Sequence, residues 1–499
     1  MADPYYITTA ISYPNGRPHI GHAYEAIAAD AIARFRRSQG FDVRLVSGTD
    51  EHGLKMAQTA RAAGRETLEY ADEMSSYFKS MCDGLNINYD AFVRTTEARH
   101  AAASVALWQA MEANDDLYLD RYEGWYSVRD EAFYDESELV GEGDDRRSPQ
   151  GTPVEWTAEE SWFFRLSAYQ DRLLALYRDQ PDFIRPDSRR NEVIRFVEGG
   201  LRNLSISRTS FDWGVPVPGS PGHVMYVWVD ALTTYMTGVG YPDTSDDFAR
   251  FWPADLHLIG KDIVRFHTVY WPAFLMSAKL PLPRQVFGHG FLLARGEKMS
   301  KSLGNVVDPM DMAARYGVDP LRYFLLREIS FGQDGSYSDE AIVNRVNAEL
   351  ANSFGNLAQR TLSMIFKNLD GVIPAAGEDS ADHALRSAVA EGCATLAREF
   401  DRLSFSTGLE AWMSAVFACN AYVDAQAPWA LRKTDPTRMA AVLGTLVECV
   451  RTLAAAVEPV IPTAAERLVA VIDGGQGGTP IAAPTPIFPR LELVEGAAA

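Results

Sequence analysis

His19 and His22 lie three residues apart in the stretch Tyr13–His22, which combines turn residues with a predicted helix start. A β-prone run precedes this stretch, and Pro18 suits the first position of a helix. A helix N-terminus offers unpaired N–H groups and partial positive charge, and Gly21 lets a ligand approach the backbone. The pattern therefore predicts a phosphate site on a strand, a turn and a helix. A polar helix start or a pair of metal ligands would give the same residues.

A second chemical cluster lies far downstream, in the glycine-bracketed residues 295–305. It holds Lys298, Ser300 and Lys301, so the sequence predicts a cationic loop rich in hydrogen-bonding groups. Lysine is a compact charge on a flexible stem, which suits a polyphosphate whose charge moves during a reaction. Taken alone, the loop would equally be a solvated surface segment with a chance pair of lysines.

Together the two stretches resemble the His-Ile-Gly-His and Lys-Met-Ser-Lys-Ser signatures of class I aminoacyl-tRNA synthetases, in the right order and on either side of a large insertion. The surrounding residues resemble the methionyl-tRNA synthetase family over nearly the whole chain, in a bacterial form without zinc-knuckle cysteines. The resemblance implies a methionine–tRNA ligase that activates L-methionine to methionyl-adenylate with ATP and Mg²⁺. It then transfers methionine to tRNA(Met), including the initiator.

The resemblance also assigns roles to the two motifs. It implies that the catalytic residues are His19, His22, Lys298 and Lys301. It implies that ATP contacts His19, Gly21, His22, Gly260, Asp262, His289, Lys298, Ser300 and Lys301. Gly260 and Asp262 fit a ribose contact, since a backbone without Cβ beside a carboxylate suits hydroxyl groups. His289 is a plausible neighbour of the adenine, and Arg208 and Glu25 are further candidates near the phosphates.

A methionine pocket is implied by a third set of residues: Ile11, Tyr13, Asp50, Trp228, Ala231, Tyr235, Ile263 and His267. Ligands of open parallel sheets bind beyond the carboxyl ends of strands, where the loop containing Asp50 is predicted. Asp50 would receive the ammonium group, although an Asx turn or a helix cap would use the same residue. Aromatic walls accommodate a thioether, although Trp228 or Tyr235 alone would suit a core. Leu232 departs from the proline of some family members.

The elements that must position these residues are predicted as alternating strands and helices. Strands are expected at 41–46, 224–231 and from 256, and helices at 67–83 and 96–113. Such alternation indicates an α/β Rossmann-like catalytic domain. An α+β connective insertion interrupts it, with short aromatic strands. No cysteine occurs in this insertion, and the insertion is too short for a separate editing domain.

The last third of the chain, from Ser338 to about Val471, has persistent helical spacing and predicts an all-α bundle of four or five helices. The resemblance implies that it binds the CAU anticodon through Asn356, Arg360, Pro428 and Trp429. Asn and Arg supply hydrogen bonds to base edges, and an exposed Trp offers a stacking face. Polar residues of a helix surface and a capping Pro-Trp pair are the alternative.

These patterns divide the chain as follows. The predicted boundaries are a first catalytic half at 1–115, a connective insertion at 116–218, a second catalytic half at 219–297, a lysine-loop and stem-contact region at 298–340, a helical anticodon-binding domain at 341–472 and an irregular tail at 473–499. No oligonucleotide-binding barrel is appended, so we expect a monomer. A small-molecule nucleotidyltransferase shares the histidine and lysine motifs but needs no helical bundle, and a catalytically silent RNA-binding relative would not need them intact.

Composition sets further bounds on the function. The 499 residues suit roughly three domains, and 47 basic against 67 acidic residues give a net charge of −20. This charge argues superficially against a nucleic-acid partner but does not exclude local basic patches. The four cysteines show no paired spacing, so we expect neither disulfides nor structural zinc. The sequence shows no export signal or membrane segment, which predicts a cytoplasmic protein without a membrane partner.

Overall fold

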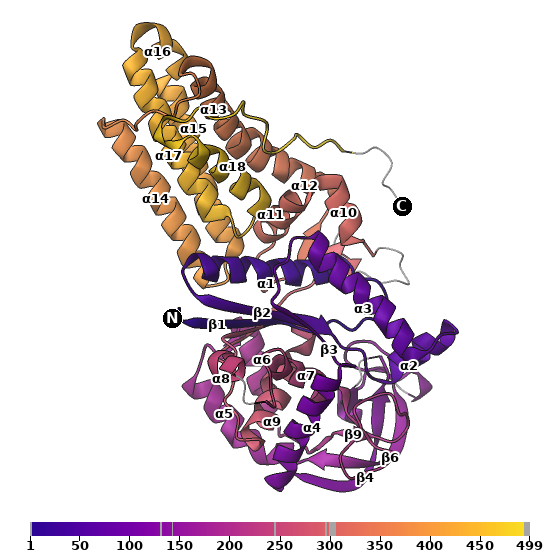
Figure 1. The fold of residues 1–499 in the computed structure, drawn as a ribbon. Helices are drawn as coiled ribbons and strands as arrows, with labels where there is room; N and C mark the ends of the chain where they lie inside the picture. Colours follow the sequence, from indigo (N-terminus) through magenta and orange to yellow (C-terminus); the bar gives the residue numbers. More distant parts are fainter. Residues whose placement is uncertain are drawn as a thin grey trace. The chain divides into compact units, whose positions relative to one another are not determined.

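The structure of the chain is a computed structural model that describes residues 2–129, 132–141, 143–243, 246–294, 297–298 and 306–493 (Figure 1). It divides into two compact units. The first unit comprises Met1–Ala29 and Gln39–His289, and the second comprises Asp30–Ser38 and Gly290–Ala499.

A parallel six-stranded sheet forms the centre of the first unit, in the order β3-β2-β1-β11-β12-β7. Its strands are β1 (Pro4–Thr9), β2 (Asp42–Thr49), β3 (Ala91–Arg94), β7 (Ile184–Arg185), β11 (Leu256–Gly260) and β12 (Val286–His289). The chain proceeds from β1 outward to β2 and β3, then forms the opposite edge with β7 and fills the space between β7 and β1 with β11 and β12. The strand order therefore reverses between β1 and β11, and ligands of such sheets bind at the carboxyl ends beside this point.

Helices cover this sheet and bury its apolar strands (Figure 1). They are α1 (Ile20–Ser38), α2 (Leu54–Ala62), α3 (Thr67–Gly84), α4 (Ala98–Ala113), α5 (Gln170–Asp179), α6 (Asp187–Glu198), α7 (Val227–Thr237), α8 (Asp246–Phe251) and α9 (Trp271–Ser277). The core between them is strongly aromatic and includes fully buried Trp108, Trp271 and Tyr235. The two helices predicted in the first half, at 67–83 and 96–113, are confirmed as α3 and α4 to within two residues.

The strand prediction at 224–231 is wrong over most of its length. Only β10 (Val224–Met225) is extended, and it pairs with β9 (Ser207–Arg208) outside the six-stranded sheet. The remainder is the first turn of α7. Because nearly every residue of α7 is buried, the segment shows no alternation that would distinguish a strand from a buried helix.

The insertion contains a four-stranded antiparallel sheet in the order β5-β4-β6-β8. Its strands are β4 (Leu117–Ser127), β5 (Ala132–Tyr134), β6 (Glu155–Phe164) and β8 (Leu204–Ser205). The short strand predicted at 132–134 is confirmed as β5, but the separate short strands predicted at 118–119 and 125–128 are wrong, because β4 and β6 pair without interruption from Leu117 opposite Phe164 to Tyr126 opposite Glu155. Exposed polar residues such as Asp120 and Glu123 break the aromatic pattern, but the backbone ladder does not depend on them.

The second unit contains the predicted helical bundle. Its helices are α10 (Pro309–Tyr316), α11 (Val318–Glu328), α12 (Asp339–Arg345), the π-helical η7 (Val346–Gly355), α13 (Asn356–Asn368), α14 (Ser380–Asp401), α15 (Phe405–Gln426), α16 (Pro428–Thr434), α17 (Pro436–Val457) and α18 (Pro462–Gly474). A small sheet in the order β14-β13-β15 joins β13 (Leu292–Ala294), β14 (Glu297–Lys298) and β15 (Gly335–Tyr337). In the described part of the chain, α17 alone has the length and apolar composition of a membrane span. Most of that helix is buried among its neighbours, as is typical of the core of a bundle.

Candidate active site

The two motif histidines flank the start of α1, which begins at Ile20. The backbone N–H of His19 donates to His22 Nδ1 at 3.1 Å, and that of Gly21 donates to His19 Nδ1 at 3.1 Å. Because Nδ1 accepts in both rings, each neutral imidazole carries its proton on Nε2. The rings lie 3.8 Å apart between centroids, so the two Nε2–H groups belong to one compact donor pair at a helix N-terminus.

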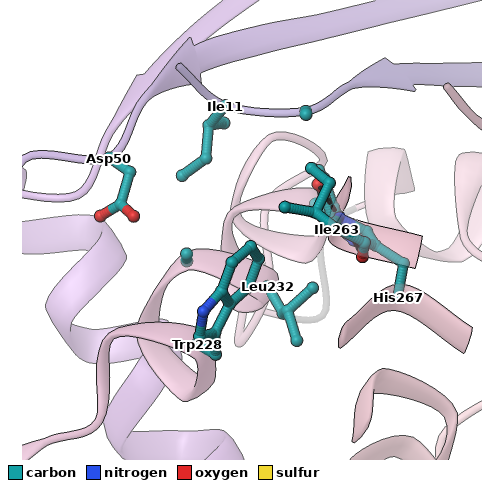
Figure 2. Close-up of a pocket in the computed structure, with 9 residues that line it drawn as sticks. Ile11, Asp50, Trp228, Leu232, Ile263 and His267 are labelled. Atoms are coloured by element: carbon teal, nitrogen blue, oxygen red, sulfur yellow. Dashed lines mark hydrogen bonds between the residues drawn. The ribbon is translucent and has the colours of Figure 1, made fainter. Parts of the chain in front are cut away.

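An enclosed pocket lies at the carboxyl ends of β1 and β2, beside the start of α7 (Figure 2). It is lined by Ala10, Ile11, Asp50, Trp228, Ala231, Leu232, Tyr235, Ile263 and His267. In Figure 2, Asp50 lies at one end, Ile263 and His267 lie at the other, and Ile11 and Trp228 lie between them. Of the predicted methionine residues, Tyr13 alone is absent from this lining. Ala10 was missed by sequence reasoning, although its place beside Ile11 at the end of β1 is a usable signal.

One wall of the pocket is a hydrogen-bonded pair, Tyr235 and His267. His267 Nδ1 lies 2.9 Å from the carbonyl oxygen of Ile263 and must donate to it, so Nε2 accepts from the Tyr235 hydroxyl at 2.6 Å. Burial lowers the pKa of His267 to about 4 and raises that of Tyr235 well above its usual value. Both groups are therefore neutral at physiological pH, which makes this wall suitable for an uncharged, polarisable side chain.

The aromatic side of the pocket is equally fixed. The Trp228 ring is stacked on Phe266, with centroids 3.8 Å apart and planes 3° from parallel. Trp228, Ala231 and Tyr235 follow one another at helical spacings of three and four residues, so α7 presents all three on one face.

The loop that carries Asp50 connects β2 to α2 and is held from several sides. The Asp50 N–H donates to the carbonyl of Ser12 at 2.9 Å. The next residue, Glu51, is fully buried and accepts from both Nε and Nη2 of Arg94, at 2.7 and 2.9 Å. Trp213 Nε1 donates to the Glu51 carbonyl at 2.7 Å. Sequence reasoning gave no role to Glu51, Arg94 or Trp213, because these contacts join residues far apart in the chain.

The predicted nucleotide residues lie at the carboxyl ends of the next two strands. Gly260 is the last residue of β11. A Cβ at this position would lie 2.7 Å from Asp262 Oδ1, so the Asp262 carboxylate can keep its position only beside a glycine. His289 ends β12, and its Nε2 lies 2.8 Å from Glu25 Oε2 on α1. Arg208, by contrast, is buried with its guanidinium 4.5 Å from the Tyr226 ring centroid.

The lysine motif falls largely outside the described residues. The backbone of Lys298 pairs with Leu293 in the small sheet, while the Lys298 side chain, Ser300 and Lys301 are not described. Their roles stay predictions.

The predicted anticodon residues include two that meet across a long sequence separation. Arg360, on α13, has its guanidinium 5.5 Å from the ring centroid of Trp429, on α16. The Trp429 side chain is 49% exposed, so it is not a core residue. Pro428 is buried at the start of α16, where Ala427 turns the chain in the left-handed region. Asn356 is exposed one turn before Arg360.

A shallow groove runs along the same face of α13. It is lined by Gln359, Arg360, Ser363, Met364, Lys367 and Asn368. Only Arg360 among these was predicted. Gln359 directly precedes Arg360 and the other four follow it at helical spacing, so the α13 periodicity could have identified them.

Family models match nearly all of the described fold. The model described as "tRNA synthetases class I (M)" matches residues 5–362, and "Anticodon binding domain of methionyl tRNA ligase" matches residues 373–482. The chain belongs to the class I methionyl-tRNA synthetase family. The family predicted from the two motifs is thereby confirmed, as are the Rossmann-like domain, the antiparallel insertion and the helical domain. The chain is a methionine–tRNA ligase that uses ATP.

Full-length relatives of this family support the same assignment. The methionine–tRNA ligase of Brucella suis biovar 1 is 57% identical, covering 98% of each chain. The crystallised methionyl-tRNA synthetase of Mycobacterium tuberculosis in complex with methionyl-adenylate has a TM-score of 0.95 and 55% identity, covering 98% of this chain and 100% of that one. Its apo form has a TM-score of 0.88 and 51% identity, covering 99% of each chain.

Proposed function

We propose that the pocket at the β1–β11 switch point binds L-methionine and that the helix start of α1 binds ATP for formation of methionyl-adenylate. The observation that carries the proposal is the neutral Tyr235–His267 wall opposite Asp50. The wall suits the thioether, and the Asp50 carboxylate suits the ammonium group. Ile11, Ala231, Ile263 and Trp228 complete the contact, and Tyr13 stays a candidate beside it.

The methionine carboxylate then attacks the α-phosphate of ATP and releases pyrophosphate. A carboxylate is already a nucleophile, so this step needs no general base and depends on orientation and charge stabilisation. His19 and His22 donate Nε2–H groups to phosphate oxygens, and the Gly21 backbone allows close approach. We assign the ribose to Gly260 and Asp262, the adenine to His289, and the polyphosphate to Lys298, Ser300 and Lys301.

We propose that Mg²⁺ binds together with ATP and that the protein has no structural zinc. The described residues contain no group of three or more His, Cys, Asp or Glu side chains that could hold a metal ion. Mg²⁺ therefore does not fit a protein-built site in this part of the chain, and we propose that it arrives on the phosphates of ATP. We assign no step to it. Structural zinc is not expected because the insertion has no cysteine thiolates.

We further propose that Asn356, Arg360, Pro428 and Trp429 bind the CAU anticodon of tRNA(Met). The exposed Trp429 face beside the Arg360 guanidinium is suited to stacking and hydrogen bonding with an unpaired base. We retain the boundaries at 115, 218, 297, 340 and 472 as proposed domain limits. We also propose a monomer in the cytoplasm, without a membrane partner.

ATP–pyrophosphate exchange measured with each standard amino acid tests this proposal. Exchange should depend on methionine, and Asp50→Asn should raise the KM for methionine with little change in the KM for ATP. Equal exchange with leucine would contradict the pocket assignment. An unchanged methionine KM in Asp50→Asn would contradict the ammonium contact alone.

A further inference from the structure

Asp230 is a buried carboxylate next to the methionine pocket that the mechanism above does not use. It is 1% exposed, and its two oxygens are bound by different imidazoles. His52 Nδ1 lies 2.5 Å from Oδ2, and His100 Nε2 lies 2.6 Å from Oδ1. Burial by itself raises the pKa of Asp230, but the two imidazoles together lower it well below its usual value. Asp230 is therefore an ionised group held inside the first unit.

The hydrogen bonds of this carboxylate continue through His100 on α4 to the end of α7. The second nitrogen of His100, Nδ1, lies 2.9 Å from Thr237 Oγ1, and the Thr237 hydroxyl donates to the carbonyl of Thr233. Thr237 Oγ1 is then free to accept from His100 Nδ1, so both ring nitrogens of His100 are hydrogen-bonded inside this cluster. Burial of a carboxylate away from water is costly in free energy unless partners such as these imidazoles compensate for the lost hydration.

The position of this cluster connects two walls of the pocket. Asp230 is on α7 between Trp228 and Ala231, which both line the pocket. His52 is two residues beyond Asp50, in the loop after β2. The Asp230–His52 hydrogen bond therefore joins the helix that carries the thioether wall to the loop that carries the proposed ammonium ligand.

Only Glu51 separates His52 from Asp50 in the chain. The loop is already fixed at the Asp50 N–H by Ser12 and at the Glu51 carbonyl by Trp213, whose ring also lies edge-on to His52 at 5.6 Å. Among the hydrogen bonds described for this loop, the one between His52 and Asp230 connects it to α7. Loss of the His52–Asp230 hydrogen bond would leave Asp50 attached to the end of β2, but it would remove the connection between this loop and α7.

We propose that Asp230 is a positioning residue for methionine recognition, acting through His52 to hold Asp50 at its place in the pocket. The inference deepens the proposed contact between Asp50 and the ammonium group and rests on it. Asp230 itself does not line the pocket. Its paired charge leaves Asp50 as the carboxylate that the methionine ammonium meets.

A double-mutant cycle in ATP–pyrophosphate exchange tests the proposal. Asp230→Asn should raise the KM for methionine about tenfold while kcat and the KM for ATP stay within about threefold, because only placement of Asp50 changes. In an Asp50→Asn background the same substitution should add less than twofold. Equal effects in both backgrounds would overturn the proposal and indicate general structural support.

Matched controls separate positioning from folding. Ser104→Ala removes a hydroxyl that donates to Asp230 Oδ1 at 3.5 Å, the oxygen bound by His100 and not by His52, so its methionine KM should be unchanged. If Asp230→Asn fails to fold, His52→Ala and His52→Asn replace it. Asn retains a donor near the Nδ1 position and should keep the methionine KM close to wild type, whereas Ala should raise it. Equal KM values for these two variants would overturn the proposal.

Inhibitors distinguish this inference from the contact on which it rests. Methioninol carries the amine and should bind Asp230→Asn more weakly, whereas 4-(methylthio)butanoate lacks the amine and should bind both enzymes equally. If Asp50→Asn leaves methioninol binding unchanged, the ammonium contact itself is wrong. If Asp50→Asn weakens it and Asp230→Asn does not, only the positioning role is wrong.

Discussion

The proposed methionine pocket and the proposed anticodon surface differ in how their polar and aromatic groups are exposed. In the pocket, polar groups such as Tyr235 and His267 are buried and already hydrogen-bonded to each other. On the helical bundle, Trp429 is half exposed and meets Arg360 through a 5.5 Å cation–ring contact. A small ligand can be enclosed in a buried, preformed pocket. An RNA base, by contrast, binds to side chains that are already exposed in the free protein. Substitutions in the two regions should therefore appear in different assays.

The largest expected effect concerns adenylation, which we assign to the pocket and the phosphate motifs. Lys301→Ala should lower the exchange rate on the order of a hundredfold or more, with less change in the KM for ATP, since the lysine acts on charge that develops in the transition state. Pre-steady-state adenylate formation measures this directly. Lys301→Arg serves as the charge-retaining control. A near wild-type rate in Lys301→Ala would remove Lys301 from the mechanism.

The two regions should also lose stability in different pH ranges. For His267, whose pKa is lowered from 6.5 to about 4 by burial, the unfolded chain takes up a proton before the folded chain does. The free energy of unfolding of the first unit should therefore fall as the pH drops from about 6.5 to 4, by about 3 kcal/mol from this residue. His257, also lowered by burial, acts in the same direction.

The helical bundle of the second unit should lose stability at lower pH than the first unit. Burial raises the pKa of Asp382, but hydrogen bonds from Arg438 and Tyr422 lower it to about 2, so its stabilisation is present above pH 4 and is lost between about 4 and 2. Hydrogen exchange that resolves the two units should show the first unit weakening before the second. His267→Gln should flatten the loss between pH 6.5 and 4. Simultaneous weakening of both units would contradict this separation.

The smaller recognition effect belongs to the anticodon surface. Trp429→Ala should weaken aminoacylation of tRNA(Met) through binding by roughly 1–3 kcal/mol, the usual contribution of a base-stacking aromatic, while methionine-dependent exchange stays normal. Trp429→Phe retains a stacking face and should lose less. Because Trp429 is half exposed, neither variant should change the unfolding curve strongly. Parallel losses in both assays would break the separation of the two regions.

The helix start between His19 and His22 and the helices at 67–83 and 96–113 depend on nearby residues and could be predicted from local signals, whereas the family and most of the pocket lining came from the resemblance that the two motifs carry. Contacts between distant residues could not be predicted. The Asp230–His52 pair spans 178 residues, and β7 has only two residues, whose place in the sheet depends on its partner β12. In α7, the burial of nearly every residue removed the alternation that distinguishes helix from strand.

The last prediction is that removal of metal ions has no effect on the stability of the insertion. The β4–β6 ladder and the aromatic contacts along it, such as Tyr118 stacked on Phe163 at 5.5 Å, hold this region without thiolate ligands. A chelator should therefore leave the thermal unfolding midpoint unchanged, and elemental analysis should find no stoichiometric zinc. Unfolding must be the readout, because the chelator also removes Mg²⁺ from ATP and would stop exchange for that reason. One tightly bound zinc per chain, or a lower midpoint in chelator, would show that ligands other than cysteine hold a structural metal.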